Sequence, residues 1–168
     1  MRPRVLVAGM GNDLRRDDGF GIEVVRRLSG AGLPEGVRLY EAGIAGIGLV
    51  QELVDGYEAL VVVDAADRGE PPGTVSLLEA EVPKPEELTA EDRRELAADM
   101  HAAVPSKALI LARALGVLPP RVYILGCQPQ DRGLGMGLST PVERGAAEAV
   151  ERLRELCGVL SSGEPVAP

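Results

Sequence analysis

Three short apolar segments constrain the fold of this 168-residue chain more than any other feature. They span residues 5–9 (VLVAG), 59–64 (ALVVVD) and 121–127 (RVYILGC). Each is nearly continuous in apolar residues, which is typical of strands that are covered by helices on both faces. Weaker strand patterns span 37–42 and 74–78, and the second of these could lie at a sheet edge. The sequence therefore predicts a sheet of about five strands.

Between these strands the apolar residues follow a helical spacing. Positions 21, 24, 25 and 28 form one apolar stripe, as on an amphipathic helix. Further helical patterns cover 49–54 and 146–156, and Pro105 suits the first turn of another helix that ends at Gly116. The alternation of strand and helix predicts an α/β fold, a twisted, mainly parallel sheet with helices on both faces.

A chain of this length is expected to form one domain. We expect a single α/β domain over residues 1–157 and a frayed C-terminal tail over 158–168. Residues 79–99 differ from the rest, because they combine eight acidic residues and two prolines with few large apolar side chains. This segment is either a solvated loop with a short helix or a mobile flap.

Charge and aromatic content exclude two classes of partner. The chain has 18 basic and 26 acidic residues, a net charge of −8, and only three Tyr and one Phe. Such a surface repels phosphate backbones and anionic lipids, and it offers few rings on which bases could stack. We therefore expect neither a nucleic-acid partner nor membrane binding.

The cysteines and the hydropathy indicate the compartment. Cys127 and Cys157 have no CxxC spacing and are expected to be buried free thiols in a reducing cytosol. No stretch approaches the roughly 20 apolar residues that a membrane span needs. We expect a cytoplasmic protein without membrane insertion.

The loop after the first strand carries the first candidate site residue. It reads GMGNDLRRDDGFG over residues 9–21. A dinucleotide fingerprint would need Gly or Ala at Leu14, and Asp17 and Asp18 would lie where a phosphate binds. A nucleotide is therefore disfavoured. Asp18 either caps the following helix or belongs to a site.

Two further candidates are predicted to lie at the same edge of the sheet. Asp64 ends a strand, and His101, the single histidine, precedes the helix at Pro105. Asp64 could instead cap the next segment or anchor the loop at Arg68, and a lone histidine is often a surface residue. Together with Asp18 they form a candidate open metal site that suits zinc, nickel, manganese or iron.

Other catalytic schemes have less support. The sequence lacks the GxSxG motif of a serine hydrolase. Cys127 ends a strand at the same predicted edge, so a pair of Cys127 and His101 is an alternative nucleophile.

Five motifs, in order, resemble those of the hydrogenase maturation endopeptidases. They are GMGNDLRRDDGFG, YEAGIAG, VVVDA, the His before PSKALILARALG, and LGCQP followed by GLSTPVERGAAEAVERL. The resemblance runs from Arg4 to about Leu156, and it implies a twisted, mainly parallel sheet between helices. It also implies removal of a C-terminal peptide from the large subunit of a nickel–iron hydrogenase after nickel insertion.

The resemblance assigns roles to individual residues. It implies that Asp18, Asp64 and His101 are the catalytic, metal-contacting residues, and that Glu41 and Gly43 contact the substrate. The divalent metal is then nickel presented by the hydrogenase large-subunit precursor, with no metal permanently bound. Many family members have Asp at the position of Glu41.

Two rival functions are compatible with parts of the sequence. A docking module could sense nickel on the maturing subunit without cutting it. A small-molecule enzyme with a parallel sheet, such as a nucleoside phosphorylase, would need basic residues around a phosphate, whereas the predicted crevice is mainly acidic.

Overall fold

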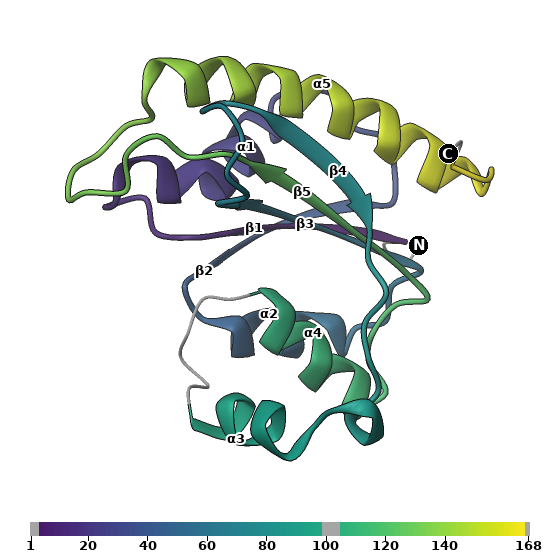
Figure 1. The fold of residues 1–168 in the computed structure, drawn as a ribbon. Helices are drawn as coiled ribbons and strands as arrows, with labels where there is room; N and C mark the ends of the chain where they lie inside the picture. Colours follow the sequence, from purple (N-terminus) through teal and green to yellow (C-terminus); the bar gives the residue numbers. More distant parts are fainter. Residues whose placement is uncertain (1–3, 99–104, 167–168) are drawn as a thin grey trace.

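The computed structural model describes residues 4–98 and 105–166, and its central layer is a five-stranded sheet (Figure 1). From one edge to the other, the strands are β2 (Val37–Gly43), β1 (Val5–Met10), β3 (Ala59–Ala65), β5 (Arg121–Cys127) and β4 (Val75–Glu79). The first four are parallel, and β4 runs antiparallel to β5. This confirms the predicted mainly parallel sheet with an edge strand near residue 75.

Helices cover both faces of the sheet, as predicted (Figure 1). One face packs against α1 (Phe20–Leu28) and α5 (Thr140–Ser162), and the other packs against α2 (Gly46–Leu53) and α4 (Pro105–Ala114). The 3-10 helix η1 (Arg16–Gly19) leads directly into α1. The loops that follow β1, β2, β3 and β5 therefore lie at the carboxyl edge of the sheet, where ligands bind in folds of this type.

Alternating side chains of the central strands supply the two halves of the core. On β3, Val61 and Val63 pack toward α1 and α5, whereas Leu60 and Val62 pack toward α2 and α4. All four are fully buried. This two-sided burial is the reason that the strand is continuously apolar in sequence.

Helix α5 is longer than the sequence pattern indicates. The expectation of a frayed tail from Gly158 is wrong for residues 158–162, which are helical. Leu160 is fully buried, as is Leu153 two turns earlier, so the apolar stripe that holds α5 on the sheet extends past the predicted end. The helix ends at Gly163, whose φ of 76° is the left-handed conformation typical of a helix C-terminus.

The acidic segment matches the first of its two predicted alternatives. It contains the 3-10 helix η2 (Pro85–Glu87) and the helix α3 (Ala90–Ala98), which lies below α2 and α4 in Figure 1. Residues 91–94 are exposed to solvent. Within the part of the chain that the structure describes, no helix is long and apolar enough to cross a membrane.

Helix α1 packs very closely against the strands beneath it. A Cβ atom on Gly21 would collide with the carbonyl oxygens of Val63 and Met10, and one on Gly9 would collide with the carbonyl oxygen of Gly21. Glycine permits this approach because it has no side chain. The beginning of α1 is thus fixed against the carboxyl ends of β1 and β3.

Candidate active site

Asp18 lies in the loop between β1 and α1 and closes that loop. Its Oδ2 atom accepts a hydrogen bond from the Asn12 N–H at 3.2 Å, and its carbonyl oxygen accepts one from the same N–H at 3.2 Å. Helix α1 begins at Phe20, and within the described chain no side chain caps its first turn. The helix-cap alternative for Asp18 is therefore wrong.

Asp64 is the second carboxylate at this edge, and it is almost fully buried, with 9% of its surface exposed. Burial raises the pKa of Asp64 to about 7, and the nearby negative charge of Asp18 adds to the rise. Gly11 lies beside both residues. A Cβ atom at Gly11 would collide with the carbonyl oxygen of Asp18 and would lie 3.6 Å from Oδ1 of Asp64.

The two carboxylates therefore lie together, as the sequence predicts. On β3, Asp64 alternates with Val63, so it belongs to the sheet face covered by α2 and α4. The helices α2 and α4 begin near each other, since a Cβ atom on Gly46 would lie 3.2 Å from the Cβ of Ala108. The N-terminus of α2 follows the loop after β2, at the carboxyl edge of the sheet.

The third candidate ligand, His101, lies outside the described residues. Among residues 4–98 and 105–166, no group of three or more His, Cys, Asp or Glu side chains is arranged to hold a metal ion. The set of Asp18, Asp64 and His101 thus stays a prediction. The chemistry of its described part suits a cation, because a positive charge between two adjacent carboxylates would relieve their repulsion.

Glu41 and Gly43 lie at the end of β2, beside this loop. The carboxylate of Glu41 accepts two hydrogen bonds of 3.1 Å from Arg26, which also donates to Asp13 at 3.1 Å. Gly43 has a positive φ of 63°, and its carbonyl oxygen accepts a hydrogen bond of 2.9 Å from the Gly11 N–H. Both residues therefore support the first loop, and their contact with substrate stays a prediction.

Gln128 anchors the loop after β3, a role that the sequence analysis considered for Asp64. Its buried side-chain oxygen accepts hydrogen bonds from the N–H groups of Arg68 at 2.7 Å and Glu70 at 3.2 Å. Its Nε2 donates to Asp67 at 3.0 Å. In the sequence, the one indication of this role is that a long polar residue, Gln128, directly follows the buried strand 121–127.

Asp17 is the most strongly hydrogen-bonded carboxylate of the site region, although its sequence context predicts no separate role for it. It is fully buried. Oδ2 accepts bonds from the N–H groups of Gln130 (2.9 Å) and Asp131 (2.8 Å) and from the Ser139 hydroxyl (2.8 Å), and Oδ1 accepts one from the Ser139 N–H (2.7 Å). Burial favours the neutral acid, but these bonds together hold the pKa of Asp17 below its usual value.

The thiol alternative has no support from the described residues. Cys127 is buried, and burial raises its pKa to about 12. Its Sγ atom faces α5, since a Cβ atom on Gly145 would lie 2.8 Å from it. The thiol thus lies on the sheet face opposite to that of Asp64 and is a poor nucleophile. Cys157 is also a buried free thiol, as predicted.

Comparison with known proteins shows relatives along nearly the whole chain. A family model described as hydrogenase maturation protease matches residues 22–155. The hydrogenase expression/formation protein HupD of Rhizobium leguminosarum bv. viciae is 35% identical over 97% of this chain and 80% of its own length.

Solved structures agree with this match. A hydrogenase 2 maturation peptidase from a Thaumarchaeota archaeon is 38% identical, with a TM-score of 0.69, and the match covers 93% of this chain and 99% of that one. The hydrogenase maturating endopeptidase HybD of E. coli is 26% identical, with a TM-score of 0.72, over 95% and 94% of the two chains. The resemblance noted in the sequence is confirmed, and the chain belongs to the hydrogenase maturation protease family.

Proposed function

We propose that this chain is an endopeptidase that removes a C-terminal peptide from the nickel-loaded precursor of a nickel–iron hydrogenase large subunit. The observation that carries the proposal is the pair of acidic residues Asp18 and Asp64, which both lie beside Gly11 at the carboxyl edge of the sheet, near enough for the charge of Asp18 to raise the pKa of Asp64. Membership in the maturation protease family supports the same reaction.

In this proposal nickel belongs to the substrate. Asp18, Asp64 and His101 contact the nickel that the precursor presents, and the protein keeps no metal of its own. Carboxylate oxygens and an imidazole nitrogen are suitable ligands for a divalent ion such as nickel. Their contact with the ion distinguishes a loaded precursor from an empty one and holds the precursor against the carboxyl edge.

The protein supplies positioning and charge for peptide hydrolysis. Hydrolysis breaks the scissile C–N bond, adds water across it and gives the new amine a proton. Bound metal can polarise the carbonyl or activate the water, and the two carboxylates place the precursor for that step. Glu41 is a candidate for proton transfer, but its ion pair with Arg26 would have to open first.

The test uses nickel-loaded and nickel-free precursor of a hydrogenase large subunit from the same cell. Each is incubated with the protein, and intact mass reports the loss of a C-terminal peptide. We expect loss from the loaded form alone, and no loss with Asp18→Asn, Asp64→Asn or His101→Ala. The variant Asp55→Asn, which changes an exposed carboxylate two residues after the C-terminal end of α2, should cleave the loaded precursor normally.

Two other outcomes would contradict the proposal in different ways. Stable binding without cleavage would identify a nickel-sensing docking module. Equal cleavage of both precursors would show that nickel does not control the reaction.

A further inference from the structure

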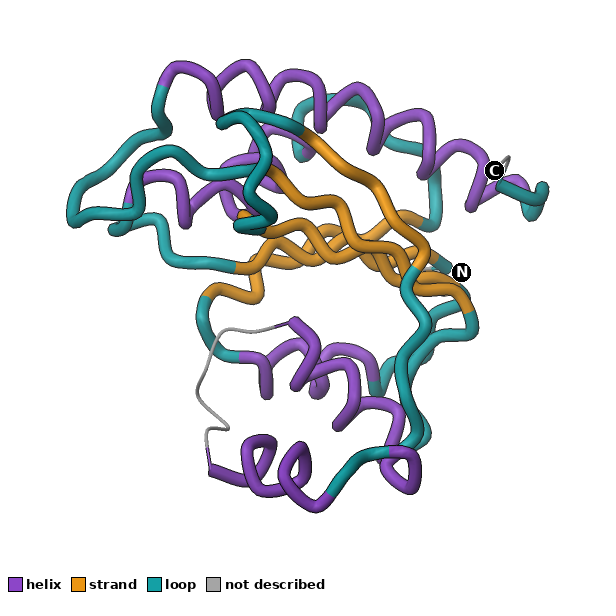
Figure 2. Tube along the Cα trace, in the orientation of Figure 1, coloured by secondary structure: helices purple, strands orange, loops and turns teal. Residues whose placement is uncertain are grey.

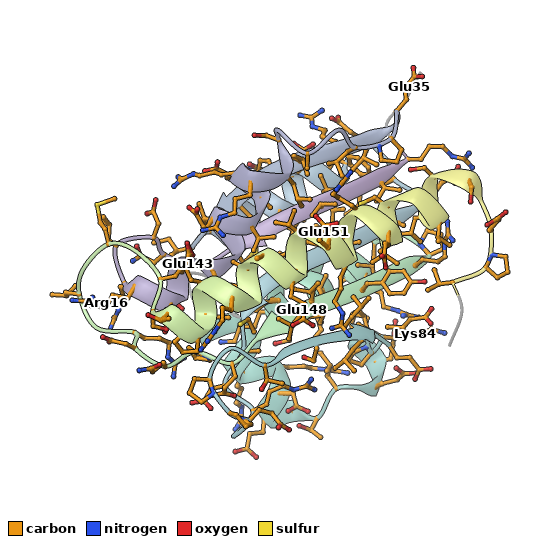
Figure 3. All side chains as sticks on the ribbon, turned by 90° about the horizontal axis from the view of Figure 1, so that it is seen from above. Arg16, Glu35, Lys84, Glu143, Glu148 and Glu151 are labelled. Atoms are coloured by element: carbon orange, nitrogen blue, oxygen red, sulfur yellow. The ribbon has the colours of Figure 1, made fainter. Side chains whose placement is uncertain are left out.

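Two loops at the carboxyl edge are joined into one projecting unit. The Arg16 N–H donates to the Gly135 carbonyl, the Gly135 N–H donates to the Leu14 carbonyl, and the Asp17 N–H donates to the Asp131 carbonyl, each at 2.9 Å. We call residues 14–16 and 130–137 the platform. Figure 2 shows these loops extending beyond the sheet, and Figure 3 shows Arg16 at that end of the molecule, beyond Glu143 on α5.

Hydrogen bonds to the buried Asp17 and between the two loops hold the platform in place. The buried Asp17 carboxylate accepts hydrogen bonds from two platform amides, those of Gln130 and Asp131. The Arg15 side chain also donates to the Arg132 carbonyl at 3.2 Å, across the two loops. A surface ordered in this way loses little conformational entropy when a partner binds.

The outer side of the platform is apolar. Leu134 is 83% exposed, Met136 is 74% exposed and Leu14 is 58% exposed. Among the described residues, Leu134 and Met136 have the largest exposed fractions of the large apolar side chains that face solvent. A single exposed apolar side chain is common, but three on one rigid projection indicate an interaction surface.

The charge of the platform is opposite to that of the chain. Arg15, Arg16 and Arg132 are exposed there. Arg16 lies 3.4 Å from Asp131, the one acidic residue within the platform, and Arg132 lies 3.5 Å from Asp67, outside it. The whole chain has a net charge of −8. An acidic partner is therefore repelled by most of the molecule and attracted to this end of it.

The platform is also continuous with the candidate site. Asp18 lies two residues after Arg16 in the same loop, and the Asp18 N–H donates to the carbonyl of Arg15 at 3.1 Å. A folded partner whose peptide bond reaches Asp18 must therefore cover the platform as well. A short peptide bound at Asp18 alone would leave the platform exposed.

We propose that the platform is the docking surface for the folded body of the large-subunit precursor, through an apolar patch bordered by carboxylates. This inference rests on the function proposed above. Leu14, Leu134 and Met136 supply the apolar contact, and the three arginines attract the acidic border. The platform adds affinity for the precursor to that of the nickel contact, whereas Asp18 and Asp64 also act in the cleavage step.

The experiment compares a platform variant, Leu134→Ser with Met136→Ser, with a matched control, Val54→Ser with Leu115→Ser. The control changes two apolar side chains that are 66% and 60% exposed and lie outside the platform. We expect the platform variant to raise both the Kd for nickel-loaded precursor and the KM by roughly tenfold or more, as for the loss of interface anchors. The kcat and the melting temperature should stay near those of the wild type, as should all values for the control.

A charge variant tests the acidic border separately. Arg132→Glu should weaken binding at low salt and lose most of that effect at high salt, because electrostatic attraction between exposed groups is screened. An unchanged Kd in the platform variant, or a fall in kcat with no change in KM, would overturn the docking proposal. If the wild type binds precursor without cleaving it, the proposed function fails, and the comparison of Kd values still tests the platform.

Discussion

Replacing Asp17 by Asn should destabilise the protein more than any change at an exposed carboxylate. The Asn oxygen can keep the three donors that now face Oδ2, but its amide group then faces the Ser139 N–H. Leaving that partly buried donor without a partner costs up to about 1–3 kcal/mol, the range for a buried one. The other three bonds change from charge-assisted to neutral, at a cost of about 1 kcal/mol each.

Part of this loss is recovered, because the neutral amide avoids the cost of burying a charge. We therefore expect the free energy of unfolding to fall by about 2–4 kcal/mol, which lowers Tm by roughly 4–16 °C for a domain of this size. Calorimetry measures this change. Hydrogen exchange should show faster exchange of the amides of Gln130, Asp131 and Ser139, the three backbone donors.

The matched control is Asp55→Asn, whose carboxylate is 65% exposed and lies 3.6 Å from Arg38. A surface ion pair of this kind contributes about 0–1 kcal/mol, so its Tm should change by no more than a few degrees. The anchoring role of Asp17 is refuted if Asp17→Asn has the same Tm as the control variant, or if hydrogen exchange at the three amides is unchanged.

Two further substitutions and one labelling experiment test other parts of the molecule. Gly11→Ala should abolish processing and lower Tm, because its Cβ collides with the Asp18 carbonyl and its φ is +118°; a processing assay with normal turnover would contradict this. Gln128→Ala removes the acceptor of the Arg68 and Glu70 amides and should lower the free energy of unfolding by about 0.5–1.5 kcal/mol per lost bond in denaturant unfolding, since water can reach these exposed residues, whereas an unchanged midpoint would rule out the anchor. Cys127 and Cys157 have pKa values raised to about 12 by burial, so a disulfide reagent at pH 8 should titrate neither thiol in the native protein and both in guanidinium chloride; rapid native labelling would show that they are accessible.

The sequence was sufficient to predict the sheet and the position of two carboxylates of the candidate site. The segments 59–64 and 121–127 form strands that are buried on both faces. Burial of both faces requires apolar side chains at nearly every position, which gives the continuous apolar pattern in the sequence. Asp18 follows β1 and Asp64 lies at the carboxyl end of the parallel strand β3, and the carboxyl ends of parallel strands meet at one edge. Their proximity therefore follows from topology and needs no knowledge of the side-chain packing.

The anchoring residues could not be predicted in the same way. Asp17 bonds to groups 113 to 122 residues away in the chain, and Gln128 bonds to amides 58 to 60 residues away. Such bonds leave no periodic pattern in the sequence. Each joins a single polar side chain to a distant loop, and the position of that loop depends on the whole fold. The length of α5 was underestimated for a related reason: Gly158 interrupts the helical pattern, but the buried Leu160 shows that packing on the sheet extends the helix beyond it.

The contact between Gly9 and Gly21 turns the first loop into a closed ring. The chain leaves the sheet after β1 and returns to touch it where α1 begins, and Asp18 of the candidate site lies within that span. The entropy lost in closing the ring is spent once, when the protein folds. A deletion of one residue inside the ring would therefore shift the whole of α1 along the sheet. In relatives with this geometry, we expect the amino-acid identities in the loop to vary more than the loop length.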